Sequence, residues 1–206
     1  MVKLARAFYE QQDVCKIAKS LLGKVLVTQF NSLRTAGIIV ETEAYAGVTD
    51  KASHASNGRR TARTEIMYAD GGVAYVYLCY GIHHLFNVVT NKKDVPHAVL
   101  VRAVEPVEGI DVMMERTGKI RFDHTLTAGP GSLTRALGIN TRHTGVVLDG
   151  DVIWIEDAPK IPSAQIIAGT RVGVAYAKED ALLPYRFSIR NNPWVSKGKG
   201  LDQIPV

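Results

Sequence analysis

The amino-acid sequence predicts an α+β fold, a single mixed α/β domain in which a few helices pack on an antiparallel or mixed β-sheet. Strand-like segments outnumber helical segments, and short turns join many of them. No linker, repeat or low-complexity stretch divides the 206 residues, so we predict one domain over residues 1–206. A hydrophobic content of 46% is enough for the core of such a domain.

Three segments carry helix signals. Asp13 can cap the first, whose apolar residues recur at helical spacing, and Gly23 can end it. Pro106 precedes the second, which Gly118 ends, and Gly138 follows the third. The predicted helices cover residues 14–22, 107–116 and 132–137.

Eight segments have the composition of β-strands, with β-branched and aromatic residues between turn-forming ones. One pair is separated only by a short turn that contains Tyr80 and Gly81, so we expect a hairpin with Tyr80 near its tip. The predicted strands cover residues 24–28, 35–41, 73–79, 85–90, 98–104, 152–156, 172–176 and 185–189.

The bulk composition limits the class of protein. A formal charge of +5 favours a polyanionic partner. There is no apolar run of 18 residues and no N-terminal signal region, so we expect no membrane partner and a cytoplasmic location, nucleoid-associated in a bacterium. Cys15 and Cys79 lie in apolar segments and are expected to be buried free thiols.

Two acids and a tyrosine are expected on one face of a strand. Glu41, Glu43 and Tyr45 are spaced by two residues, so their side chains point the same way. Such a face is either a solvent-exposed sheet edge or a site in which a carboxylate orders and deprotonates a water molecule.

A group of tyrosines follows. Tyr75 and Tyr77 share a strand face, and we interpret Tyr75 as part of the core. Tyr80 at a hairpin tip has little core to fill and could act as a wedge in a base stack. Tyr77 and Tyr45 could face each other across a slot about one base thick, where stacking contributes about 1–3 kcal/mol per base.

Basic residues are candidates for contact with phosphates. Arg59, Arg60 and Arg63 fall in one loop, which could also be an ordinary solvated charge run. The helix start at Ser132 offers backbone amides, although ordinary helix caps look the same. Further positive charge comes from Lys197 and Lys199.

Several motifs are missing from the sequence. The six histidines have no spacing typical of a metal site, and no Cys-x-x-Cys pair occurs. There is no dinucleotide-binding glycine motif and no Gly-x-Ser-x-Gly elbow. We therefore expect no metal and no cofactor, and disfavour a metalloenzyme, a dinucleotide enzyme and a serine hydrolase.

Taken together, these motifs resemble the alkyladenine (3-methyladenine) DNA glycosylases of base-excision repair. The resemblance covers nearly the whole chain and follows the family's order of motifs. It rests on the helix at 14–23, Glu-Thr-Glu-Ala-Tyr at 41–45, Tyr-Val-Tyr-x-x-Tyr-Gly at 75–81, Leu-Val-Arg-Ala at 100–103, Gly-Pro at 129–130 and Asn-Pro-Trp-Val-Ser at 192–196. It implies a single α/β domain around a curved antiparallel β-sheet.

The resemblance also implies residue roles. Glu43 would activate water with Arg102 helping to place it, and Glu41 would not be the catalytic acid. Tyr80 would enter the space that the flipped nucleotide leaves. The base pocket would be lined by Tyr45, His54, Tyr77 and Asn87, with Asn87 crowding the 2-amino group of guanines. The loop at 60–63 lacks a proline that is common in the family, and Tyr68 stands where phenylalanine is usual.

The expected function is a monofunctional glycosylase that acts on double-stranded DNA containing damaged purines, alkylated or deaminated. It would flip the purine out, hydrolyse the N-glycosidic bond and leave an abasic site. We expect a monomer with no obligate protein partner. One alternative is a non-catalytic module that binds damaged DNA or RNA, and another is an enzyme that hydrolyses sugars outside nucleic acid.

Overall fold

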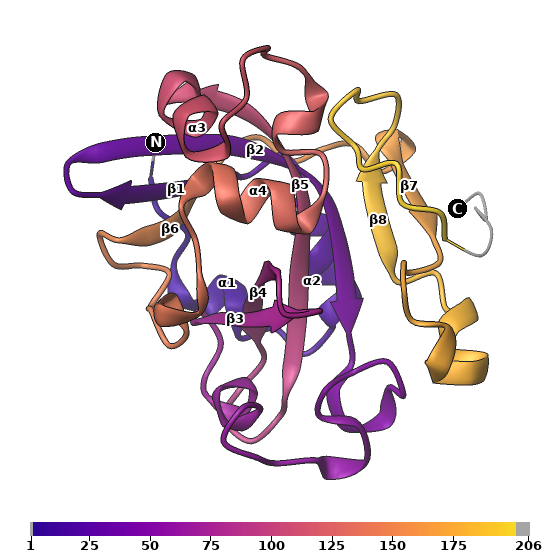
Figure 1. The fold of residues 1–206 in the computed structure, drawn as a ribbon. Helices are drawn as coiled ribbons and strands as arrows, with labels where there is room; N and C mark the ends of the chain where they lie inside the picture. Colours follow the sequence, from indigo (N-terminus) through magenta and orange to yellow (C-terminus); the bar gives the residue numbers. More distant parts are fainter. Residues whose placement is uncertain (1, 201–206) are drawn as a thin grey trace.

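A curled antiparallel β-sheet in the shape of a half-barrel is the centre of the computed structural model (Figure 1). The structure describes residues 2–200, and within them the sheet has eight strands. This confirms the predicted mixed α/β architecture and the curved antiparallel sheet. The predicted domain range of 1–206 also includes Met1 and residues 201–206, which lie outside the described residues.

The strands follow the order β3-β4-β5-β2-β1-β6, with β8 also paired to β2 and β7 to β8. All these pairings are antiparallel. The long strand β2 is flanked by β5 on one side and by β1 and then β8 on the other. The bounds are β1 Val25–Phe30, β2 Leu33–Tyr45, β3 Ala74–Cys79, β4 His83–Thr90, β5 His97–Glu108, β6 Ile153–Glu156, β7 Ile166–Gly169 and β8 Arg186–Ile189.

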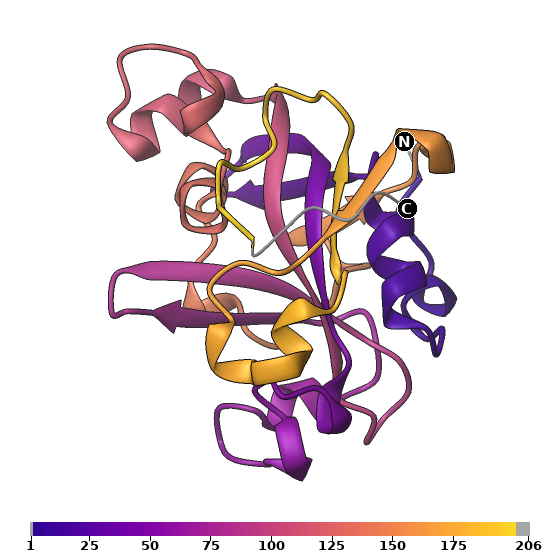
Figure 2. The ribbon, with the colours of Figure 1, turned by 90° about the vertical axis from the view of Figure 1, so that its right-hand side faces the viewer.

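Helices cover both faces of this sheet. Helix α2 (Val14–Leu21) lies on one face and α4 (Pro130–Leu137) on the other, as Figures 1 and 2 both show. The α2 helix begins as predicted, because the Asp13 side chain accepts a hydrogen bond of 3.0 Å from the amide of Lys16. Apolar side chains from both helices pack into one large core with the sheet.

Three sequence expectations need correction. Helix α3 (Ile110–Thr117) starts after Gly109, because Pro106 and the two residues after it continue β5. The predicted strand at 172–176 is wrong: Gly173 has a φ of +76°, and a 3-10 helix begins at Ala175. The short helix α1 (Arg6–Tyr9) and strand β7 were not predicted.

The central pairing of β2 with β5 contains two irregularities close together. Ile39 pairs with Val104 and Glu41 with Ala103, while Thr42 pairs with Val101. One residue of each strand, Val40 in β2 and Arg102 in β5, is therefore left without a partner in this pairing. Such bulges bend a sheet and redirect side chains, and they are frequent next to active sites.

Three parts of the chain project from the body of the molecule. Figure 2 shows the β3–β4 hairpin at the left, the α3 region above it and the loops of residues 47–68 below it. The hairpin and these loops supply residues that line the candidate site.

Candidate active site

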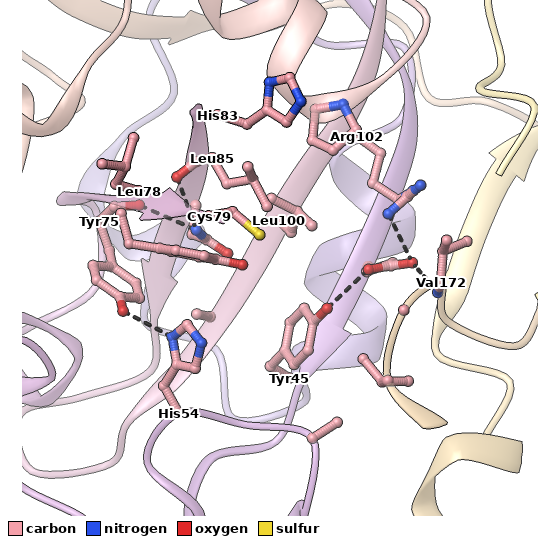
Figure 3. A pocket seen from close by; sticks show the side chains of 18 of the residues that line it. Tyr45, His54, Tyr75, Leu78, Cys79, His83, Leu85, Leu100, Arg102 and Val172 are labelled. Atoms are coloured by element: carbon pink, nitrogen blue, oxygen red, sulfur yellow. Dashed lines mark hydrogen bonds and ion pairs between the residues drawn. The ribbon is translucent and has the colours of Figure 1, made fainter. Parts of the chain in front are cut away.

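A cavity of about 470 Å³ opens among strands β2 to β5 and the segment that follows residue 170 (Figure 3). It brings together residues that are far apart in the sequence. The residues predicted from the sequence that line it are Glu43, Tyr45, His54, Arg63, Tyr77, Tyr80, Asn87 and Arg102. The predicted catalytic, pocket and intercalating residues thus share one cavity.

Glu43 is completely buried and is held by three donors. Its Oε2 accepts a hydrogen bond of 2.9 Å from the Tyr45 hydroxyl. Its Oε1 accepts one of 2.8 Å from the Val172 amide and lies 3.2 Å from Nη1 of Arg102. Burial, followed by the nearby Glu43 charge, raises the pKa of Tyr45 well above its ordinary value, so its hydroxyl keeps its proton and donates.

Glu41 lies beside Glu43 and is also completely buried. Its Oε1 accepts a hydrogen bond of 2.9 Å from Nε of Arg102, which is itself 5% exposed. Glu41, Glu43 and Tyr45 belong to one chain of contacts through Arg102. Glu43 and Tyr45 line the cavity and Glu41 does not, and the pairing of β2 with β5 shifts register at Glu41, so a common strand face for all three stays a prediction. The alternative of a solvent-exposed edge is wrong, because β5 and β8 pair on either side of this part of β2.

Aromatic rings form the opposite wall of the cavity. The ring centroids of Tyr77 and His54 are 4.6 Å apart at 75°, and those of Tyr77 and Tyr75 are 5.5 Å apart. Nδ1 of His54 lies 2.8 Å from the Tyr75 hydroxyl. Tyr75 was interpreted as core only, but although buried it also lines the cavity. Its spacing of two residues from Tyr77 was the signal that could have placed it there.

His54 is held in its neutral form. Burial, and then the charges of Arg63 and Arg59, lower its pKa from 6.5 to about 4. Nη2 of Arg63 lies 3.4 Å from Nε2 of His54. Because a guanidinium only donates, Nε2 is the acceptor and Nδ1 carries the proton toward Tyr75.

This depressed pKa predicts a pH dependence of stability. The unfolded chain binds a proton at His54 near pH 6.5, whereas the folded protein resists protonation until about pH 4. The contribution of His54 to stability is therefore complete above pH 6.5 and is lost as the pH falls toward 4. Urea unfolding at about pH 7 and about pH 5 should show that His54→Gln loses less stability on acidification than wild type. An equal loss in both proteins would contradict the assignment.

Asn87 lines the cavity and is 3% exposed. Its Nδ2 donates to the backbone carbonyls of Tyr75, at 3.2 Å, and Leu85, at 3.3 Å. These two hydrogen bonds fix the orientation of its amide.

Tyr80 stands at the tip of the β3–β4 hairpin, as predicted. Tyr80 and Gly81 both have left-handed φ angles, of 50° and 73°, as the two central residues of a tight hairpin turn require. The Tyr80 side chain is 87% exposed, while the residue also lines the cavity. A large aromatic ring is therefore presented to solvent at the cavity mouth.

The loop arginines differ in their surroundings. Arg63 lies at the cavity mouth with its guanidinium 5.0 Å from the Tyr77 ring centre. Arg60 forms ion pairs with Glu65, at 2.7 Å, and Asp94, at 2.8 Å. Its charge is thus locally balanced. Arg59 is exposed next to it.

The other predicted phosphate contacts lie elsewhere. Ser132 is in the first turn of α4, close to Pro130, which lines the cavity. Lys197 and Lys199 border a second cavity of about 440 Å³ beside β7 and β8. The structure therefore does not bring the two lysines to the same cavity as Arg63.

Part of the site was missed by the sequence reasoning. Val172, Val174 and Tyr176 line the cavity, and the Val172 amide contacts Glu43. They fall in the segment that was predicted to be a strand, and no local motif marks them. No cluster of potential metal ligands occurs among residues 2–200, and no helix in that range is long and apolar enough to cross a membrane.

Comparison with known proteins identifies the class. The family model described as methylpurine-DNA glycosylase matches residues 7–193, nearly the whole chain. The chain is accordingly a DNA glycosylase, a hydrolase of N-glycosyl bonds. The chain belongs to the methylpurine-DNA glycosylase family.

Similar proteins from several bacteria support this assignment. A protein of Bacillus cytotoxicus is 44% identical over 95% of this chain and 100% of its own length. Proteins of Clostridium acetobutylicum and Chlamydia abortus are 45% and 47% identical, over 95% and 89% of this chain and 98% and 96% of their own. All three bear the name "Putative 3-methyladenine DNA glycosylase".

Proposed function

We propose that this protein removes damaged purines, 3-methyladenine and other alkylated or deaminated bases, from double-stranded DNA. It flips the purine into the cavity and hydrolyses the N-glycosidic bond, which leaves an abasic site. The observation that carries the proposal is the buried Glu43 carboxylate, held by three donors at the wall of an aromatic cavity. In this proposal the chain acts as one glycosylase domain and as a monomer.

Glu43 is the general base. A carboxylate that accepts hydrogen bonds on both oxygens is fixed in orientation, and it can order a water molecule and take its proton during attack on the sugar carbon. The Arg102 guanidinium contacts Glu43 and helps to place that water. As the bond to the base breaks, positive charge develops on the sugar, and the nearby carboxylate stabilises it.

The aromatic walls select the base. Tyr45 and Tyr77 stack on its two faces, and electron-rich faces of tyrosine attract a cationic alkylated purine. His54 completes the wall as a neutral ring. Asn87, whose amide is fixed by two hydrogen bonds, crowds the 2-amino group of guanine.

Tyr80 holds the duplex open. Extrusion of a base costs a few kcal/mol, and less when the base is damaged and pairs poorly. The exposed ring at the hairpin tip occupies the gap, while Arg59, Arg60, Arg63 and Ser132 contact phosphates on the side of the molecule that carries the cavity. Lys197 and Lys199 contact the backbone further away.

Replacing the wedge should weaken flipping. We expect Tyr80→Ser to lower the affinity for a lesion duplex by about 5- to 150-fold, which corresponds to a stacking loss of about 1–3 kcal/mol. Tyr80→Phe keeps the ring and should stay close to wild type. Fluorescence anisotropy with a lesion duplex, together with the fluorescence of a 2-aminopurine next to the lesion, measures both effects. Equal affinity and equal base exposure in Tyr80→Ser and wild type would remove Tyr80 from the flipping step.

The reaction class can be tested by the state of the DNA strand. A monofunctional glycosylase releases the free base and leaves the strand intact until it is heated in alkali. On a methylated duplex we expect the free base to be released and the strand to break only after heating in alkali. Tight binding without release would favour a damage-recognition module, and release from free nucleosides would favour a sugar hydrolase outside nucleic acid.

A further inference from the structure

A second buried carboxylate belongs to the site, although it does not face the cavity. Glu41 is completely buried and does not line the cavity, yet both of its oxygens are used. Its Oε1 accepts from Nε of Arg102 at 2.9 Å, Nε of Arg186 at 2.6 Å and the Ser196 hydroxyl at 3.0 Å. Its Oε2 accepts from the Ser196 amide at 2.8 Å.

These contacts fix the guanidinium that meets Glu43. All three nitrogens of Arg102 have partners: Nε contacts Glu41, Nη1 contacts Glu43 and Nη2 donates to the Ser196 hydroxyl at 3.3 Å. A guanidinium held at each nitrogen cannot rotate away from the carboxylate that it orients. Without Glu41, the Nε contact would be lost and the position of Nη1 beside Glu43 would depend on Ser196 alone.

The charges of the cluster balance. Two carboxylates, Glu41 and Glu43, meet two guanidinium groups, Arg102 and Arg186, and none of the four is more than 11% exposed in its side chain. Neighbouring Arg171 is paired with its own carboxylate, Asp50. In such a buried place the interaction between charges is weakly screened. One negative charge fewer would leave a net positive cluster beside a reaction that creates positive charge on the sugar.

We infer that Glu41 is a positioning residue and the counter-ion of the catalytic centre: it fixes Arg102 against Glu43 and keeps the cluster neutral when the sugar becomes cationic. This inference rests on the proposed glycosylase function. It assigns the two acids of the Glu-Thr-Glu-Ala-Tyr segment to different tasks, with Glu43 acting on water and Glu41 acting through Arg102.

A charge series tests the inference. Relative to wild type, Glu41→Gln makes the cluster more positive, Arg186→Gln makes it more negative, and the double variant restores the balance. Each protein is titrated with two duplexes at one salt concentration, one with a protonated pyrrolidine in place of the damaged nucleoside and one with a neutral tetrahydrofuran. The pyrrolidine carries the charge that the sugar acquires during reaction, and the tetrahydrofuran does not.

We expect the ratio of affinities, pyrrolidine over tetrahydrofuran, to fall about tenfold or more in Glu41→Gln, to rise in Arg186→Gln and to return toward wild type in the double variant. In Glu41→Gln the single-turnover excision rate should fall together with this affinity ratio. The affinity for the tetrahydrofuran duplex should stay close to that of wild type. Glu156→Gln is the matched control, because Glu156 is also a buried, arginine-paired acid but lies on β6, at the opposite end of the strand order from β3, and does not line the cavity.

A ratio that stays constant across the series overturns the inference, as does an equal loss of affinity for both duplexes. If Glu41→Gln does not fold, Arg186→Gln and the double variant still test the inference. The affinity ratio is predicted to rise in Arg186→Gln and to return toward the wild-type value in the double variant. A wild-type protein that excises no damaged base would instead contradict the proposed function, so the two failures are distinguishable.

Discussion

Glu43→Gln is expected to reduce the rate constant of base excision by about 100- to 10,000-fold, the usual contribution of a general base. Glutamine has nearly the same shape as glutamate. Its carbonyl can still accept from the Val172 amide and Arg102, and its amide can donate to the Tyr45 oxygen, reversing the present hydrogen bond. The variant should therefore fold and bind lesion DNA as wild type does, while it cannot take a proton from water.

Single-turnover excision and equilibrium binding on the same lesion duplex separate these two effects. Glu156→Gln again serves as a control for the removal of a buried acid away from the cavity. A Glu43→Gln protein with normal binding and full excision would remove Glu43 from the mechanism. A protein that loses binding to the same extent as excision would point to a role in structure.

The largest expected effect on stability comes from Arg171. Its side chain is fully buried and makes two contacts with Asp50, at 2.5 and 2.9 Å. It also donates to the carbonyls of Ala44, at 3.0 Å, and Asp180, at 3.1 Å, and packs against the Tyr45 ring. It thereby joins the end of β2, the following loop and the segment after β7. We expect Arg171→Met to lower the free energy of unfolding by about 3–5 kcal/mol, because Asp50 is left buried and unpaired.

Arg60→Ala provides the matched control. Arg60 pairs with two carboxylates, but its side chain is 44% exposed and water screens both pairs, so its loss should change stability far less than the loss of Arg171. Urea unfolding of both variants compares the two sites. In addition, Arg171→Met combined with Asp50→Leu should be less destabilised than Arg171→Met, because no unpaired charge remains. Equal stabilities of Arg171→Met and Arg60→Ala would contradict this account.

Much of the fold could be predicted because local signals agree with it. A few neighbouring residues are enough to predict the helix cap at Asp13, the helix end at Gly138 and the turn at Tyr80. The structure confirms each of these three features. Where the sequence misled, a local signal was overruled. Pro106 is typical of a helix start, yet it lies in β5, because the pairing with β2 extends past it.

The candidate site was likewise predictable only in part. Spacing by two residues predicted that Glu41 and Glu43 share a face, but not that the face would be buried, since burial depends on β8 arriving beside β2. The Val172 amide could not be predicted, because its role arises from a bend at Gly173 and a contact with a residue 129 positions away. Such contacts exist only once distant strands have assembled.

Base excision by Glu43 can be decided with two labelled duplexes, one with a single hypoxanthine and one treated with a methylating agent. Each is incubated with wild type and with Glu43→Gln and then heated in alkali, which breaks the strand at abasic sites. The account predicts cleavage with wild type only, on the methylated duplex at least, and both duplexes together compare alkylated with deaminated purines. Tight lesion binding without cleavage of either duplex would contradict the account and favour a damage-recognition module.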